Sequence, residues 1–503
     1  MDLGDIMKRP MVAAGIIAIL LSIIVINAKI SAILAVLITA AVLLGITIVI
    51  KRFRNLLAVF VVAVVILLNA LYVLGPINAR IGQINSNERV SVSGEIISAY
   101  FEDGRAVYTL KTDNANDVLP RNIKLNVYSK FAVFDIGEKV ECDMYVKEIL
   151  PRYKASYFSK GVYLTANVAG VNKVYEQTNL NSVLALFRAK VTNVLNKYLS
   201  YDVAATVNAL TVGDKYYISN EFDRAVKRCG VSHVMVVSGL HLSIICGTLL
   251  KILSSLRLGK RLSALITAVG VFLFMALCGF SMSILRAGIT FFIMLASLAF
   301  IRRTDPLNSL MIAVSLIICI NPFSVGSVAF VLSVASTAGI IILSKPIADF
   351  FKMYHFFTIK GVRAIVDAAS VTLSALVFTL PLTVYYFGGF STVAVITNLL
   401  IGFPVTVALI TATAALPFAL LTDYSVIANG IFLITEAVTR YFNFVINYFS
   451  RLPFSYVNVN ETIFIGVYLA IIAIFGIIKY RKMIYKRGIR LWQSLTSKCS
   501  KQT

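Results

Sequence analysis

The chain has 503 residues, and its composition excludes a soluble globular protein. Hydrophobic residues make up 58% of it and charged residues only 14%, and its mean hydropathy is +0.84. Soluble domains usually carry about 25% charged residues. We therefore expect a membrane protein that crosses the bilayer many times. Apolar runs long enough to cross a hydrocarbon core of about 30 Å recur along the chain, for example at 11–27, 56–74 and 262–280.

The net charge is +23, and basic residues gather at 51–54, 251–261, 302–303 and from 479 onwards. The positive-inside rule places such clusters in the cytoplasm, although attraction to a polyanion would favour the same residues. Under this rule residues 1–76 form the N-terminal transmembrane helices, at about 11–27, 30–50 and 55–75. A second apolar run directly after the first favours anchoring helices over a cleaved signal peptide. We expect a multi-pass protein of the bacterial cytoplasmic (inner) membrane with both termini in the cytoplasm.

Residues 77–178 change to the alternating pattern of β-strands. The segments are rich in β-branched and aromatic residues, and turn signals separate them. Five short strands over this length predict a small barrel of the OB type. The topology places this domain outside the cell. The strands are expected at 89–98, 105–111, 122–128, 139–149 and 161–168.

The remainder of the chain predicts helices. Residues 179–230 favour amphipathic helices in the membrane interface or across the mouth of the bundle. Residues 231–480 form the transmembrane core, which brings the total to about 10–12 transmembrane helices, and residues 481–503 form a basic cytoplasmic tail. The expected core helices lie near 232–251, 262–280, 284–301, 306–321, 326–343, 364–387, 391–421, 426–449 and 462–479. The 391–421 segment carries Pro404 and Pro417, which makes it a candidate for a broken or re-entrant helix.

The densest polar segment is VSHVMVVSGLH, at residues 231–241. On one continuous helix His233 and His241 would lie about 80° apart, and Ser238 and His241 would share a face. Gly239 would allow a neighbouring backbone to come close. Three hypotheses compete for this segment: a metal site, a serine–histidine nucleophile, and a polar seam that lines a pore or packs helices. The seam is favoured, because polar groups within a membrane usually face the bundle interior or a water path.

A second segment, GFSMSILRAG at residues 279–288, places Arg286 in an otherwise apolar run beside Ser283. An arginine at mid-membrane costs roughly 2.5–3.5 kcal/mol on insertion scales, so it is normally partnered or lines a cavity. The predicted topology puts Arg286 near the outer end of its helix, where snorkelling to the interface is the alternative. Further along, Asp305 begins another helix.

The six cysteines form no CxxC pair, and no group has the spacing of metal ligands. The sequence therefore predicts neither a metal nor a cofactor. Cys142 and Cys229 fall outside the membrane in the predicted topology, which leaves a disulfide between them open.

Taken in order, these segments resemble the ComEC family, the competence proteins that form the DNA-internalisation channel of naturally transformable bacteria. The resemblance covers about residues 75–480. Its most specific element is SGLH at 238–241, which follows Ala209-Leu210-Thr211-Val212-Gly213-Asp214. Other matching positions are Gly279-Phe280, Ser283, Arg286, Ala287, Asp305, Asn321-Pro322, Phe330 and Leu332-Ser333.

The sequence departs from the family pattern in two places. Many members continue into a metallo-β-lactamase-like domain, but the chain carries no HxHxDH motif. The segment Leu150-Pro151-Arg152-Tyr153 stands where members usually have Asn-Pro. The resemblance then implies a separate nuclease, a helicase-like cytoplasmic ATPase and an outer DNA receptor as partners, and a homo-oligomer stays open.

The resemblance implies a non-enzymatic channel for single-stranded DNA, which passes through the lipid bilayer during transformation. The alternatives are a membrane-embedded hydrolase that uses Ser238 and His241, and a transporter of another polyanion. OB folds hold single strands on aromatic rings beside basic groups. The expected polar path comprises His233, Ser238, Gly239, His241, Ser283, Arg286 and Asp305, and the candidate DNA-binding residues of the barrel are Tyr100, Arg105, Tyr108, Arg121, Lys124, Tyr128 and Lys130.

Overall fold

The computed structural model describes most of residues 10–470. The basic clusters at 51–54 and 302–303, and the tail, lie outside the described residues. Within 10–470 the gaps are 28–29, 50–56, 82–88, 103–104, 114–121, 130–133, 176–178, 216, 236, 302–303, 354–359, 423–424 and 469.

The N-terminal helices α2 (Pro10–Asn27), α3 (Ile30–Val49) and α4 (Leu57–Ile81) confirm three of the predicted apolar segments. Helices α2 and α4 pack against α13 (Pro306–Ile320) through a shared apolar cluster. The amide of Asn69 in α4 donates to the carbonyl oxygens of Cys319 and Ile320, at 2.7 and 2.8 Å. These bonds satisfy carbonyl groups that the end of a helix leaves free, and so tie the N-terminal helices to the core.

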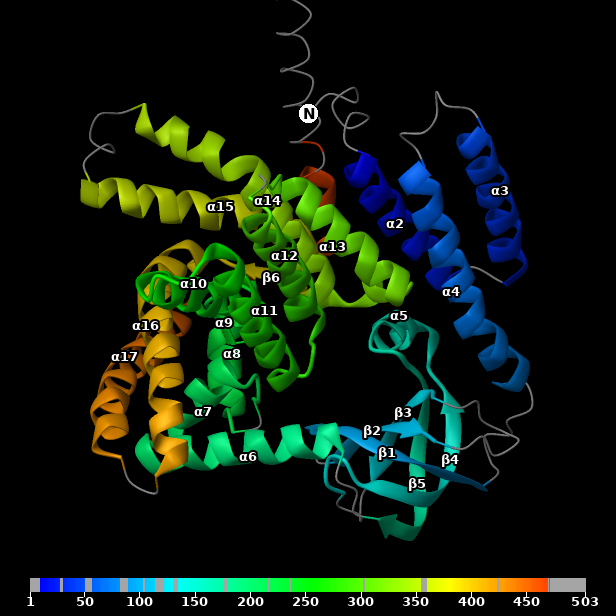
Figure 1. Ribbon diagram of the computed structural model, residues 1–503, viewed down its shortest axis with the longest axis horizontal. Coiled ribbons are helices and arrows are strands. Elements are labelled where there is room, and N and C mark those ends of the chain that lie inside the picture. The colour runs from blue at the N-terminus through cyan, green and yellow to red at the C-terminus, as the bar shows by residue number, and fades with distance from the viewer. Residues whose placement is uncertain are drawn as a thin grey trace, which may run out of the picture.

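Five strands form a closed barrel in the order β1-β2-β3-β5-β4, which confirms the predicted OB-like domain (Figure 1). Only β3 and β5 pair in parallel. Alternate residues point inwards, as in Leu110, Leu125 and Val140 of the barrel core. The strands are β1 (Arg89–Glu102), β2 (Arg105–Thr112), β3 (Lys124–Ser129), β4 (Lys139–Glu148) and β5 (Val162–Tyr175).

Helix α5 (Pro151–Ser159), between β4 and β5, joins the barrel to the helical core. The ring of Phe158 packs edge to face on Phe323, with centroids 5.2 Å apart. The amide of Asn321 donates to the carbonyl oxygens of Phe158 and Ser159, at 3.3 and 2.8 Å. Phe323 precedes the short helix η2 (Ser324–Gly326). The Asn321-Pro322 element of the sequence therefore serves the contact between the two domains.

Helix α6 (Leu180–Tyr198) runs along the barrel side of the core (Figure 1). It is followed by α7 (Tyr201–Thr211) and α8 (Asn220–Arg228). The apolar side chains of α6 have two different surroundings. Val191 and Leu195 are buried against α7 and α16, whereas Val183 and Phe187 are exposed. The first half of α6 leaves the core to reach the barrel, so its apolar side chains have no protein to cover them.

The remaining described helices form the core. They are α9 (Ser232–Met235), α10 (Gly239–Ser255), α11 (Lys260–Leu277), α12 (Met282–Ala299), α14 (Val328–Lys352), α15 (Lys360–Phe387), α16 (Ala394–Leu421) and α17 (Val426–Ser450). Strands β6 (Gly389–Ser391) and β7 (Tyr456–Asn458) pair beside them. Among the described residues, six helices are long and apolar enough to cross a membrane, and four more are shorter but apolar.

Two expectations are corrected by the structure, and the question of a disulfide, which the sequence left open, is answered. The single helix expected at 232–251 is two helices, α9 and α10. The segment at 391–421 is not broken, because α16 contains both Pro404 and Pro417 within one continuous helix. Cys142 and Cys229 are free thiols, since Cys142 lies in the barrel core and Cys229 packs with α17 residues of the helical core.

The close contact of α5 with η2 predicts that one methyl group added at Gly326 would weaken the attachment of the barrel to the core. A Cβ at Gly326 would lie 2.1 Å from the carbonyl oxygen of Ala155, so Gly326→Ala must push α5 away. We expect a lower midpoint of thermal unfolding and faster protease cleavage between barrel and core, because overpacking usually costs about 1–3 kcal/mol. Gly247→Ala is the control, because nothing lies within 4 Å of its Cβ position. Equal behaviour of the two variants would contradict this account of the contact.

Candidate functional site

The SGLH segment is a helix start. Ser238 is the N-cap of α10, and its hydroxyl accepts from the amide of Leu240 at 3.3 Å. Its own amide donates to Nδ1 of His241 at 3.1 Å. The two residues thus form a reciprocal capping box. His233 and His241 therefore lie on different helices, and the helical-wheel angle expected for one helix does not apply.

The two histidines have different surroundings. His233 on α9 is exposed, whereas His241 is fully buried. Because Nδ1 of His241 accepts the amide of Ser238, the hydrogen-bond network assigns the ring proton to Nε2. That buried Nε2 has no hydrogen-bond partner within the described part of the chain. His241 thus presents a buried donor in the first turn of α10.

Arg286 is buried in α12 with 6% of its surface exposed, so it does not snorkel to the interface. Its Nε donates to the hydroxyl of Ser333 on α14 at 2.8 Å. The hydroxyl of Ser283 donates to the same oxygen at 3.2 Å. No ion pair joins Arg286 to an acid among the described residues. The guanidinium is therefore hydrogen-bonded to one neutral hydroxyl, that of Ser333, and Ser283 bonds to the same oxygen.

The two polar segments meet at Gly239. A Cβ there would lie 3.1 Å from Nη2 of Arg286 and 3.3 Å from Cβ of Ala287. The guanidinium group therefore lies directly against the first residue of α10. Glycine permits this approach, as the sequence predicted, but the neighbour is a side chain and not a backbone. The structure brings together Ser238, Gly239, His241, Ser283 and Arg286, and with Ser333 we call them the Arg286 group.

Asp305 does not join this group. Its carboxylate caps α13 and accepts from the amides of Leu307 and Asn308, at 2.9 and 3.1 Å. It follows the C-terminal end of α12, whereas Arg286 lies near the N-terminal end. About 20 Å of helix separates Arg286 from the C-terminal end of α12. The structure assigns Asp305 to a helix cap.

The residues of the barrel that were predicted to bind DNA do not all lie on one surface. Tyr108 is only 2% exposed and packs edge to face on Phe134, so it belongs to the barrel core and offers no ring face to a base. Lys124 and Tyr128 are half-buried on the outer face of β3, and the Tyr128 hydroxyl lies 3.0 Å from that of Tyr157. The side chains of the other candidates lie outside the described residues: Tyr100, Arg105, Arg121 and Lys130.

Lys124 faces a like charge. It pairs with Lys111 across β2 and β3. Burial, and to a smaller extent the charge of Lys111, lower the pKa of Lys124 below its usual range. Both effects disfavour the ammonium form, and a nearby anion would favour it.

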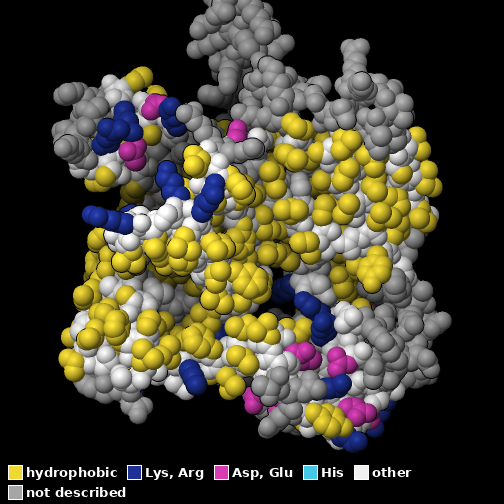
Figure 2. All heavy atoms as spheres, viewed as in Figure 1, with side chains coloured by type: hydrophobic (Ala, Val, Ile, Leu, Met, Phe, Trp, Pro, Cys, Tyr) yellow, Lys and Arg dark blue, Asp and Glu magenta, His cyan; other side chains and the backbone are white. Residues whose placement is uncertain are grey.

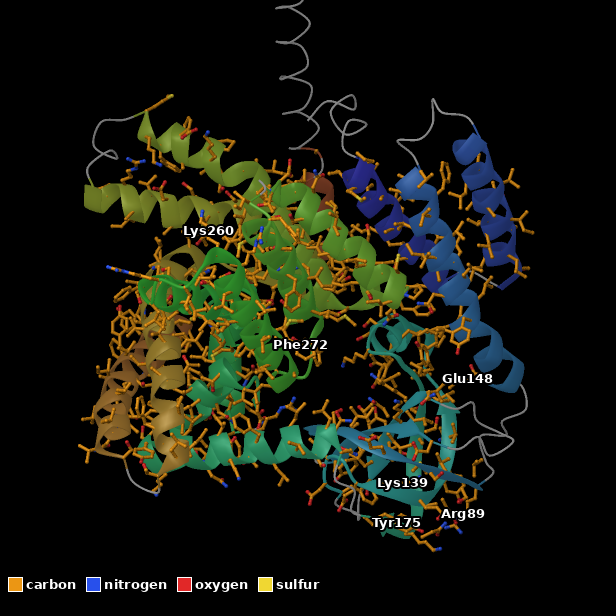
Figure 3. All side chains as sticks on the ribbon, viewed as in Figure 1. Arg89, Lys139, Glu148, Tyr175, Lys260 and Phe272 are labelled. Carbon is orange, nitrogen blue, oxygen red and sulfur yellow. The ribbon has the colours of Figure 1, made fainter. Side chains whose placement is uncertain are left out.

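The barrel and the Arg286 group lie on the same side of the core. Figure 3 shows Lys260 at one end of α11 and Phe272 nearer the other end, which faces the barrel. At that end Arg188 of α6 donates to the carbonyl oxygens of Leu277 and Ala276, at 2.6 and 3.1 Å. Helix α12 starts directly after it. Figure 2 shows a hollow here between core and barrel, with Lys and Arg side chains beside it.

Two contacts near this site could not be predicted from the sequence. They are those of Ser333, which lies in a matched motif, and of Arg188 on α6. A single serine in an apolar helix carries little signal by itself, because its hydroxyl often bonds to its own helix. Only the packing of α14 on α12 shows that the hydroxyl of Ser333 accepts a hydrogen bond from Arg286.

Comparison with known proteins identifies the family. A family model described as Competence protein matches residues 210–483, which include the whole Arg286 group. The chain belongs to the Competence protein family. A curated relative, ComE operon protein 3 of Bacillus subtilis (strain 168), is 25% identical over 248 residues. The alignment covers 49% of this chain but only 30% of that relative. No solved structure matches this competence protein significantly.

The Arg286 group predicts unequal effects of two serine substitutions. Ser333→Ala removes the acceptor of a charged donor, and a buried donor left without a partner costs about 1–3 kcal/mol. Ser283→Ala removes one neutral bond to the same oxygen, worth about 1 kcal/mol. We expect the thermal unfolding midpoint of the purified protein to fall more for Ser333→Ala. A larger fall for Ser283→Ala would contradict the geometry at Arg286.

Proposed function

We propose that this competence protein is a non-enzymatic channel that carries single-stranded DNA across the cytoplasmic membrane during natural transformation. The observation that carries the proposal is Arg286, a buried guanidinium in the helical core without an acid partner in the described chain. Ionisable groups inside membrane proteins are rare, and they commonly mark the paths of ions and substrates. A positive group on such a path favours a polyanion.

The electrostatics of DNA entry support a positive path. Each phosphate charge that moves into an inside-negative cell is opposed by about 2.3 kcal/mol per 100 mV. Buried positive groups lower the added cost of taking that charge out of water. We place His233, Ser238, Gly239 and the Arg286 group on this path. A separate cytoplasmic ATPase would supply the work, and an outer receptor and a nuclease would deliver the single strand.

The barrel is proposed as the outer entry domain. Its OB-like topology suits single strands, and Lys111 and Lys124 make an electropositive pair on adjacent strands. Helix α5, which packs on the core, carries the exposed Lys154, and the exposed Lys160 follows at its C-terminal end. A strand held there would meet the core on the side of Arg286. This orientation also leaves both termini in the cytoplasm.

The hydrolase is the second candidate, because the hydroxyl of Ser238 lies 3.1 Å from Nδ1 of His241. The same atoms already form the capping box of α10. No carboxylate orients His241 through Nε2 within the described chain, so the third member of a catalytic triad is missing from that part. The contact is better explained as a helix cap. Transport of another polyanion would use the same positive path, and the family favours DNA.

Uptake of labelled DNA in a deletion strain tests the proposal. The wild-type gene is expected to restore internalised, nuclease-protected label without a change in label bound at the cell surface. Ser238→Ala should retain most internalisation, since loss of an N-cap costs only about 1 kcal/mol. Gly239→Val should abolish most of it, because its side chain collides with Arg286 and Ala287.

The outcomes separate the candidates. A hydrolase that uses Ser238 would lose essentially all activity with Ser238→Ala at normal protein level, which would contradict the channel. Unchanged internalisation in the deletion strain would also contradict it. Gly247→Val is the control for a larger side chain in α10, because the space around Gly247 is open.

A further inference from the structure

Two arginines in this protein, the half-buried Arg188 and the buried Arg286, lie at helix ends of opposite sign. Arg188 donates to the carbonyl oxygens at the C-terminus of α11, where a cation is favourable. Arg286 instead lies against Gly239, the first residue of α10, where the helix dipole is positive. A cation at a helix N-terminus is unfavourable. The second arrangement therefore calls for a compensating negative charge.

The Arg286 side chain has hydrogen-bonding capacity left. A guanidinium carries five N–H donors, and only Nε has a partner in the described part of the chain, the hydroxyl of Ser333. The Nη groups lie on the side of Gly239. The buried Nε2 of His241, in the same turn of α10, is a further donor without a described partner. Free guanidinium donors, a formal charge and the positive end of a helix dipole thus meet beside Gly239, whereas His241, two residues further on, points to another side of α10.

We propose that Arg286 and the first turn of α10 form a binding site for one phosphate group. The identity of that phosphate as a phosphodiester of the transported strand rests on the proposed function. A guanidinium matches phosphate oxygens with two parallel hydrogen bonds, and the positive end of the α10 dipole adds to the attraction of its charge. Gly239 is required because a Cβ there would lie 3.1 Å from Nη2 and would push the guanidinium away from the start of α10. Successive phosphates would occupy the site one at a time.

Salt dependence of binding tests this site without measuring transport. The full chain is purified in a maltoside detergent, which carries no phosphate, and the affinity for a short oligothymidylate is measured over a range of sodium chloride. For single strands the slope of log K against log salt is about −0.7 per phosphate contact. Arg286→Gln is expected to reduce the slope by about 0.7 and the affinity by about tenfold. Arg286→Lys should keep the slope.

Arg440→Gln is the matched control, because Arg440 is exposed and already pairs with Glu436 at 2.6 Å. It should leave slope and affinity unchanged. If Arg286→Gln does not fold, Gly239→Ala reports on the same site, and we expect weaker binding from it. An unaltered slope in Arg286→Gln, an equal change in Arg440→Gln, or wild-type affinity in Gly239→Ala would each overturn the inference. The uptake experiment tests the proposed function separately. If that function is wrong, the wild-type gene will not restore internalised label in the deletion strain.

Discussion

A guanidinium group buried among membrane helices has to be hydrogen-bonded and enclosed, and the packing around Arg286 follows from this requirement. Ser333 of α14 supplies its acceptor, Ser283 supports that hydroxyl, and Gly239 lets α10 approach the group. Three helices from separate parts of the sequence are thereby fixed around one charge. None of these neighbours is an acid, so the charge stays available to an anion. The arrangement is costly for a purely structural core and suits a path for a polyanion.

The rest of the molecule is attached to this core by polar groups at helix ends. Asn69 ties the N-terminal helices to α13, Asn321 ties the barrel to the core through α5, and Arg188 ties α6 to α11. Each bond satisfies a carbonyl group that would be costly to leave unpaired in a membrane. Asn321 and Arg188 lie on the barrel side of the core, and Arg286 lies near the start of α12, which follows the end of α11 that Arg188 contacts.

Much of this fold follows from the sequence, because hydropathy and alternation report burial directly. They predict the strands, the three N-terminal helices and most core helices. The break before α10 could not be predicted, since the residues on both sides of Ser238 are equally apolar and a serine–histidine capping box lacks the usual glutamate or glutamine. Tyr108 was misassigned because residue type was weighed without its register. It lies two residues from both Ala106 and Leu110 and therefore shares their face, which points into the barrel. The contact between Gly239 and Arg286 depends on how α10 packs against α12, and this packing cannot be predicted from a single sequence.

The passage of DNA beside Arg286 can be measured directly by photo-crosslinking in cells that are taking up labelled DNA. A photoreactive residue replaces Leu240, which follows Gly239 and is 45% exposed. The matched position is Phe444, which is 66% exposed on α17. The account predicts that position 240 captures the labelled strand during uptake and that position 444 does not. Capture at both positions alike, or at neither while label is internalised, would contradict a DNA path through this core.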